Sequence, residues 1–306
     1  MSAPRFVAAG TTVLITRRAL RRHFLFRPDP DINQLFVYAL AVCSQRFAVE
    51  VHCAVLMSTH EHILATDTRG CLPEFTAMLH RILALGTKVL RKWEGAVWDN
   101  DRPSVVHTRT PEAVIREYGY VMSNPVTAGA VEYAKQWPGV WLGAADPSRC
   151  VVRVQRPEVY FDAERGDWPE HAELVLTLPV VLRRQHTDSD LRTLLTTEHL
   201  RQEQMARDEA KRKGWKFLGA LKAQLCSPFR RATSYEPLRS RNPAFAVGPG
   251  NREQFFAAVQ WLRDFRSAYR AALTDWCLGL RHALFPFGTW HMRRFHAAPA
   301  APQPSD

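Results

Sequence analysis

The stretch VLMSTHEHIL, residues 55–64, places two histidines one residue apart directly after an apolar run. In a β-strand, residues i and i+2 project from the same face, so His60 and His62 can converge on one ion while Glu61 points away from them. The pattern alone also fits two surface imidazoles, because the chain contains 12 histidines and chance pairs are expected. A metal site therefore requires a third ligand and a reacting group from another part of the sequence.

The segment YVMSNPV, residues 120–126, supplies candidates for both roles. Tyr120 and Asn124 are four residues apart on an expected helix, which places them on the same side of it. The tyrosine hydroxyl is a candidate nucleophile, and the asparagine amide oxygen would complete a His-His-Asn ligand set. Spacing alone favours a different interpretation, a half-buried tyrosine followed by a helix-ending asparagine.

The segments around these motifs predict an α+β fold. Strands are expected at residues 11–16, 46–57, 60–66 and 104–108, and helices from residue 31, over 72–93 and from 111 to 124. The last helix is expected to end at Asn124-Pro125, since proline disfavours helical geometry in the residue before it. This order matches a ferredoxin-like antiparallel sheet with packed helices.

The rest of the chain predicts a different kind of structure. Residues 188–213 and 252–284 read as two long helices, and the apolar stripe of the second indicates core packing. The expected organisation is a catalytic domain of residues 8–145, then a mainly helical region of residues 146–296 that is a candidate auxiliary DNA-binding region. The tail of residues 297–306, AAPAAPQPSD, is expected to be disordered.

Composition narrows the choice of partner and compartment. The net charge of +11 over 306 residues favours a polyanion, and nucleic acid rather than a membrane. The six cysteines form no CxxC pair, which argues against a zinc ribbon and for a reducing compartment. No signal-peptide pattern and no apolar run long enough to span a bilayer are present, so the sequence predicts a cytoplasmic protein.

Together, the two motifs resemble those of single-tyrosine HUH transposases, in particular the REP-associated tyrosine transposases. That family carries a stretch like VLMPNHVHLL where this chain has VLMSTHEHIL, and later one like YIHLNPVRAGLV where this chain has YVMSNPVTAGAV. Both motifs occur in the family's order, on the expected strand and helix, and the resemblance covers roughly residues 8–140.

The resemblance implies a function for the candidate residues. His60, His62 and Asn124 would bind Mg²⁺ or Mn²⁺, and Tyr120 would be the nucleophile. The implied enzyme is a transposase that cleaves and rejoins single-stranded, hairpin-containing DNA through a 5′-phosphotyrosine intermediate. Family members occur as homodimers and as monomers, so both states are open.

Two positions depart from the family pattern. Glu61 stands where an apolar residue is usual, and Thr59 where asparagine is usual. A buried, unpaired carboxylate is costly, so we expect a basic or hydrogen-bonding group beside Glu61, or an opening to water. Tyr118 is a rival nucleophile, but the residue four positions on is Met122, which is not polar. The alternatives are a catalytically decayed or repurposed nucleic-acid-binding protein of the same fold, and a metal-dependent hydrolase that uses water.

Two basic clusters are candidates for contacts with nucleic acid. The first follows the opening strand, and the second lies in FPFGTWHMRRFH, residues 285–296, where aromatic side chains are interleaved with arginines. The residues concerned are Arg17, Arg18, Arg21, Arg22, Arg293 and Arg294. The first cluster is equally compatible with a solvated face, and the second with a loop that closes the C-terminal helices.

Overall fold

The computed structural model describes residues 4–100, 102–162, 166–233 and 243–304. Within these ranges a six-stranded sheet has the order β5-β2-β3-β1-β4-β8, and β6 and β7 form a separate pair. The strands are β1 (Thr11–Arg18), β2 (Val49–Met57), β3 (His60–Asp67), β4 (Ser104–Thr108), β5 (Trp141–Gly143), β6 (Val151–Gln155), β7 (His171–Val175) and β8 (Phe245–Ala246). The helices are α1 (Pro30–Phe47), α2 (Leu72–Arg91), α3 (Pro111–Thr127), α4 (Val180–Arg183), α5 (Asp188–Arg212), α6 (Ala220–Leu225), α7 (Arg252–Cys277) and α8 (His291–His296).

The first seven elements confirm the predicted α+β fold. They follow the order β1-α1-β2-β3-α2-β4-α3, and the four strands β2, β3, β1 and β4 lie side by side as antiparallel neighbours. This is the ferredoxin-like arrangement. β5 extends the sheet antiparallel to β2, while β8 pairs in parallel with β4, so the complete sheet is mixed.

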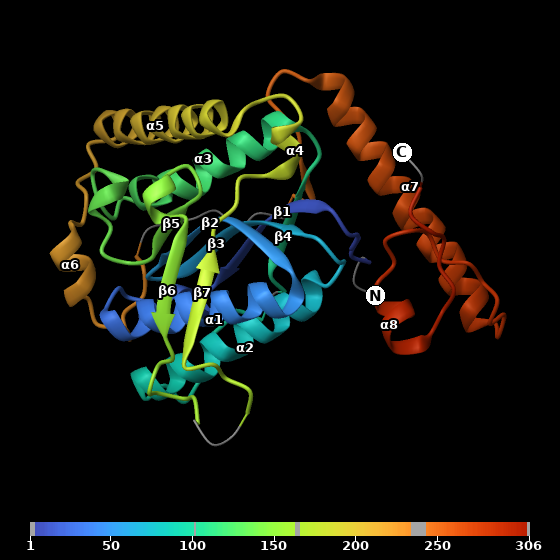
Figure 1. Cartoon of the computed structure of the whole chain (residues 1–306), viewed down its shortest axis with the longest axis horizontal. Coiled ribbons are helices and arrows are strands. Elements are labelled where there is room, and N and C mark those ends of the chain that lie inside the picture. Colours follow the sequence, from blue (N-terminus) through green and yellow to red (C-terminus); the bar gives the residue numbers. More distant parts are fainter. Residues whose placement is uncertain (1–3, 101, 163–165, 234–242, 305–306) are drawn as a thin grey trace.

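Helices cover both faces of this sheet. Figure 1 shows α1 and α2 on one face and α3 on the other, with α5 outside α3. Both α1 and α2 begin at a carboxylate. Asp29 accepts a hydrogen bond from the backbone of Ile32, and Asp67 at the end of β3 accepts from the amide of Leu72. The cap of α1 is thus Asp29, and the helix begins at Pro30, one residue before the predicted start.

The helix α3 begins as predicted but ends later than predicted. Thr110 caps it by accepting from the amide of Ala113, and Pro111 occupies its first turn. The expected end at Asn124-Pro125 is wrong, because the helix continues to Thr127. A proline in the last turn removes only one backbone hydrogen bond, and the amide of Ala128 still bonds to the Asn124 carbonyl. Asn124 therefore keeps helical geometry.

The two long C-terminal helices are present as α5 and α7. The second ends at Cys277, earlier than expected, where Gly279 adopts a φ of 91° and turns the chain. The β6–β7 hairpin was not predicted, and it packs on α1. Buried side chains of β7 and α5, including Leu174 and Leu191, join the same core cluster as the first seven elements. The core thus continues across the boundary predicted at residue 145.

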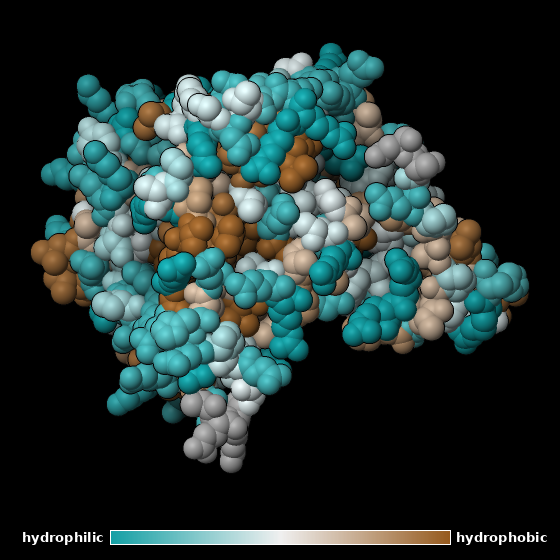
Figure 2. Space-filling model, viewed as in Figure 1, coloured by the Kyte–Doolittle hydropathy of each residue, from teal (hydrophilic) through white to brown (hydrophobic). Residues whose placement is uncertain are grey.

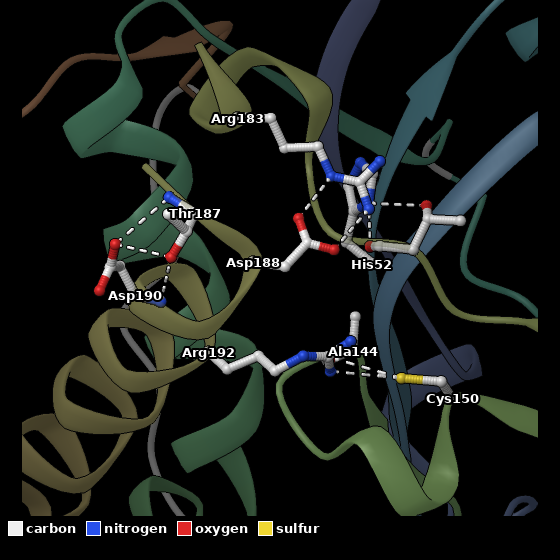
Figure 3. A network of polar contacts seen from close by, with 9 residues as sticks. His52, Ala144, Cys150, Arg183, Thr187, Asp188, Asp190 and Arg192 are labelled. Atoms are coloured by element: carbon white, nitrogen blue, oxygen red, sulfur yellow. Dashed lines mark hydrogen bonds and ion pairs between the residues drawn. The ribbon is translucent and has the colours of Figure 1, made fainter. Parts of the chain in front are cut away.

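Side-chain contacts also fasten α5 to the first region. Figure 3 shows Arg192 extending from α5 to the carbonyl of Ala144 and toward the thiol of Cys150. At the start of α5, Thr187 and Asp190 form a reciprocal capping box. The inner side of α5 is thereby held against the first region, while its highly charged outer face is exposed.

The tail is more ordered than expected. Phe285 donates its amide to the Pro299 carbonyl, and Ala301 donates to the Phe285 carbonyl, so residues 298–301 pack against the chain rather than being disordered. Residues 305 and 306 lie outside the described ranges. In the described part of the chain, none of the helices combines the length and the apolar character that crossing a bilayer requires.

Candidate metal and nucleophile site

The structure brings the two sequence motifs together between β3 and α3. His60 and His62 share one face of β3, and Tyr120 and Asn124 lie one turn apart on α3. The Nε2 atom of His60 is 3.0 Å from the Oδ1 atom of Asn124. The ring centroids of the two histidines are 4.8 Å apart, and those of His62 and Tyr120 are 5.2 Å apart. The side chains of all four predicted residues therefore lie next to one another between β3 and α3.

A threonine hydroxyl contacts the Nδ1 atom of each imidazole ring. Thr59 Oγ1 lies 2.9 Å from Nδ1 of His60, and Thr16 Oγ1 lies 2.8 Å from Nδ1 of His62. A contact at one ring nitrogen fixes the ring orientation and decides which nitrogen is presented to a ligand. Here Nδ1 is engaged in both rings, so Nε2 is the nitrogen that each ring would present to a ligand. Thr59, a departure from the family pattern, takes part in this arrangement.

The chemistry of these donors fits a divalent cation. His62 is 3% exposed, and burial, followed by the positive charges of His60 and Arg18, holds its pKa well below the ordinary value. A neutral imidazole is the form that binds metals. Two imidazole nitrogens and the Asn124 oxygen would leave positions for phosphate oxygens on a Mg²⁺ or Mn²⁺ ion. Within the described residues, no group of three or more His, Cys, Asp or Glu side chains is placed to hold a metal.

The rival tyrosine, Tyr118, is buried in the core and away from the histidines. Tyr118 is 2% exposed, and its hydroxyl accepts a hydrogen bond of 3.0 Å from the amide of Ala145. Burial raises the pKa of this phenol far above its ordinary value. The hydroxyl also packs so closely on Gly143 that a Cβ atom there would lie 2.4 Å from it. Tyr118 thus points to β5, whereas Tyr120 is half-buried beside His62.

On the opposite face of β3, Glu61 lies in a buried polar cluster. Its side chain is 0% exposed and its Oε1 atom is hydrogen-bonded to Nε2 of His80 on α2. Trp98 donates its indole N–H to the His80 carbonyl at 2.8 Å, and the Arg17 guanidinium lies 5.0 Å from the Trp98 ring centroid. The prediction that a basic or hydrogen-bonding group lies beside Glu61 is confirmed.

The first basic cluster divides between the two faces of the sheet. Arg18 pairs with His60 in the β1–β3 register and therefore lies on the histidine face, whereas Arg17 pairs with Glu61 on the other. Arg21 and Arg22 follow β1 in a turn with positive φ values of 48° and 57°. The amide of Arg21 donates to the Asp99 carboxylate. Of the four arginines, Arg18 is thus the one that the strand itself directs to the histidines.

The second basic cluster lies at the other end of the sheet. Trp290 donates its indole N–H to the Glu74 carboxylate, and Nε of Arg294 is 3.6 Å from Oε1 of the same residue. Glu74 is in the first turn of α2, just after β3 ends, while His60 is at the start of β3. At ~3.3 Å per residue, the strand separates these points by about 20 Å. Arg293 and Arg294 are therefore not brought to the histidines.

Comparison with protein families gave no matching family model, and comparison with curated proteins gave no match either. Among solved structures, the chain is similar to a structure of a REP-associated tyrosine transposase bound to a REP hairpin. The TM-score is 0.39 and the sequence identity 18%, over 45% of this chain and 81% of the other. A similarity of this extent decides neither the family nor the activity of this chain.

Proposed function

We propose that this protein is a metal-dependent DNA strand transferase of the transposase type, which cleaves and rejoins single-stranded DNA that contains a hairpin. The observation that carries the proposal is the convergence of His60, His62, Asn124 and Tyr120 on one space between β3 and α3. A nucleophile beside three side chains that could hold a metal ion is an arrangement suited to phosphodiester transfer to a side chain. The net charge of +11 is consistent with a nucleic-acid substrate.

Tyr120 would act as the nucleophile. A tyrosine hydroxyl has a pKa of about 10 and attacks poorly at neutral pH without assistance. A Mg²⁺ or Mn²⁺ ion held by His60, His62 and Asn124 would polarise the scissile phosphate and offset its developing charge. The Tyr120 oxygen bonds to phosphorus and loses its proton. The bond from phosphorus to the 3′-oxygen breaks, and that oxygen takes up a proton.

The product is a 5′-phosphotyrosine and a free 3′-hydroxyl. Because the phosphodiester free energy is kept in the covalent link, a 3′-hydroxyl can attack it in reverse and rejoin the strand without a nucleotide cofactor. The threonine hydroxyls on the two Nδ1 atoms keep the imidazoles in place during both steps. Arg18, on the histidine face at the edge of the site, is placed to contact the DNA backbone.

The test is covalent capture on single-stranded hairpin DNA in the presence of Mn²⁺, followed by a denaturing gel. We expect an adduct with the wild-type chain and with Tyr118→Phe, and none with Tyr120→Phe, which should still bind DNA. Tyr118→Phe is the matched control, since it removes the same atom two residues away on the same helix. An adduct that persists in Tyr120→Phe and disappears in Tyr118→Phe would show that the nucleophile is assigned to the wrong tyrosine.

One observation favours a second candidate, a hairpin-binding protein that does not cut. The direct contact between His60 Nε2 and Asn124 Oδ1 satisfies both groups as a hydrogen bond without an ion. In that case the chain would bind hairpin DNA equally well with EDTA and after Tyr120→Phe, and would not bind Mn²⁺. Electron paramagnetic resonance of Mn²⁺ added to the wild type and to His62→Ala separates the two candidates. If His62 is a ligand, the wild type gives a bound-Mn²⁺ signal that His62→Ala loses. The second candidate gives no bound-Mn²⁺ signal in either protein.

A further inference from the structure

A segment that the proposed chemistry does not use lies beside the end of the sheet that carries the histidines. It comprises residues 213–232, which run from the end of α5 through α6, and we call it the α6 strap. Its first half is bonded to the chain that follows α3. The amide of Leu218 donates to the carbonyl of Gly129 at 2.9 Å, five residues after Asn124. Figure 1 accordingly shows α6 at the end of the molecule where α3 ends.

The other end of the strap is bonded to the segment that follows β1. His23 and Arg231 form an antiparallel bridge, and Nε of Arg231 lies 3.1 Å from Nε2 of His23. The segment after β1 in turn contacts the start of β3, since the amide of Ala19 donates to the Thr59 carbonyl at 2.7 Å. Thr59 immediately precedes His60. The strap is therefore attached next to both elements that carry the candidate site, α3 and β3.

The ionisable side chains of the strap are all basic or thiol. Of its 20 residues, five are lysine or arginine and none is aspartate or glutamate. The five are Lys213, Lys216, Lys222, Arg230 and Arg231, and all of them are exposed. Lys213 pairs with Glu209 of α5, but among the described residues no carboxylate forms an ion pair with Lys216, Lys222 or Arg230. A short segment with this much uncompensated positive charge attracts a polyanion.

The strap also exposes aromatic rings that contribute little to the core. Trp215 is 58% exposed and Phe229 is 53% exposed. Phe229 stacks on Trp93, with 6.0 Å between the ring centroids and 24° between the ring planes. The ammonium group of Lys213 lies 4.5 Å from the centroid of the Trp215 ring. Exposed rings interleaved with lysine and arginine are the surface that single-stranded nucleic acid binds, by stacking its bases and pairing its phosphates.

The helix between these rings adds an apolar patch. Ala223 packs into the core, whereas Leu221 and Leu225 point outward and are 67% and 70% exposed. Figure 2 shows apolar side chains on the surface at the position of α6. Such a patch alone would also fit a second copy of the chain. A symmetric dimer through the strap would, however, bring two uncompensated basic segments together, which the like charges oppose. The charge thus favours nucleic acid over a second copy.

We propose that the α6 strap binds the unpaired bases of single-stranded DNA beside the hairpin. The bases would stack on Trp215 and Phe229, and the exposed lysines and arginines would contact the phosphates. Unpaired bases offer free faces to these rings, whereas the bases of a hairpin stem are already stacked on one another. The proposal rests on the proposed function only in taking single-stranded DNA as the ligand, and it does not depend on cleavage.

Fluorescence anisotropy of the full chain in EDTA tests the proposal with two labelled DNAs. One is a hairpin with unpaired extensions on both sides of its stem, and the other is the same hairpin without them. The wild type should bind the extended hairpin more tightly. Trp215→Ala and Phe229→Ala should each weaken that binding at least about fivefold, the loss expected for one unstacked base, and leave binding of the bare hairpin unchanged.

Two further variants control for effects on folding and on general stickiness. Trp215→Phe keeps a ring and should retain most of the affinity for the extended hairpin. Phe256→Ala is the matched control, because Phe256 is 55% exposed on α7, which lies on the other side of the molecule from α6 (Figure 1). It should change the affinity for neither DNA. Since Trp215 is largely exposed, its substitution should also leave the circular dichroism spectrum unchanged.

The proposal would be overturned if the wild type bound both hairpins equally, or if both alanine variants bound the extended hairpin as well as the control does. Analytical ultracentrifugation tests the competing partner. A wild-type dimer that Leu221→Gln dissociates, with DNA binding unchanged, would assign the patch to a second copy instead.

Covalent capture with Mn²⁺ separates the strap from the strand-transfer chemistry. Binding of the extended hairpin that depends on both rings, without an adduct in the wild type, would support the strap and refute strand transfer. An adduct in the wild type, with both rings dispensable for binding, would do the reverse.

Discussion

The buried contact between Glu61 and His80 makes a quantitative prediction about the strand that carries the histidines. Both side chains are almost completely buried, at 0% and 2% exposure. Removing one partner of a buried ionisable pair costs ~3–5 kcal/mol. Glu61 Oε2, however, is already without a partner among the described residues, and removing it recovers ~1–3 kcal/mol of desolvation. For Glu61→Val we therefore expect a loss of about 2 kcal/mol in the free energy of unfolding.

A double-mutant cycle isolates the contact. His80→Leu should cost about as much as Glu61→Val, because it leaves a carboxylate buried without its partner. In the double variant neither orphaned group remains, so its stability should lie within ~1 kcal/mol of the wild type. Against two single losses of about 2 kcal/mol each, that corresponds to a coupling of at least ~3 kcal/mol. Glu50→Val on β2, a half-exposed position outside the cluster, is the control and should change stability by less than about 0.5 kcal/mol.

The assay is urea unfolding followed by circular dichroism, combined with Mn²⁺ affinity and adduct formation for each variant. Glu61 points away from His60 and His62, so both functional readouts should be retained in Glu61→Val. Destabilisation of the double variant by the sum of the two single losses would show that the side chains do not interact. A folded Glu61→Val protein that has lost Mn²⁺ would make Glu61 itself a ligand and refute the assignment of faces along β3.

Three further outcomes follow from the geometry. Burial lowers the pKa of His52 and of His107 to about 4, so the unfolded chain binds more protons than the folded chain between pH 6.5 and 4. The urea midpoint should fall as pH falls through that window, and a midpoint that stays constant from pH 7 to 4.5 would contradict this. Arg18→Gln should weaken binding to single-stranded DNA and lower by about 1 the slope of log binding constant against log salt concentration. Arg293→Gln, at the far end of the sheet, should change neither quantity. Equal effects of the two substitutions in a salt titration would refute the assignment of Arg18 to the DNA contact. His60→Ala should abolish the bound-Mn²⁺ resonance signal while DNA binding in EDTA stays near the wild-type level, and an unchanged signal would exclude His60 as a ligand.

The local geometry of the candidate site could be predicted because it depends on short-range periodicity. The period of two along β3 places His60 and His62 on one face, and the helical period places Tyr120 and Asn124 on one side of α3. The error at Pro125 did not disturb this, because the helix continues through it and Asn124 stays in register with Tyr120. Elements that follow from local patterns were therefore predictable.

Contacts that depend on strand pairing were not predictable. Thr16 lies opposite His62 only because β1 and β3 pair in one particular register, and nothing in the sequence around Thr16 marks it as a partner for an imidazole. The same holds for His80, which is 19 residues from Glu61 and reaches it only once α2 packs on the sheet. The β6–β7 hairpin was missed because a mainly helical region was predicted after the boundary at residue 145, whereas the hairpin packs on α1 and adds buried residues to the core.

The two faces of β3 make different contacts, and this explains how the strand accommodates Glu61 at a buried position. An apolar residue between the two histidines would anchor the strand by burial alone. Glu61 loses that contribution, but the contact with His80 ties β3 to α2, and His80 is in turn bonded to Trp98. Each of these contacts is on the face opposite the imidazoles. The strand can thus be held in place by a polar anchor on one face, while the threonine hydroxyls position the two imidazoles on the other.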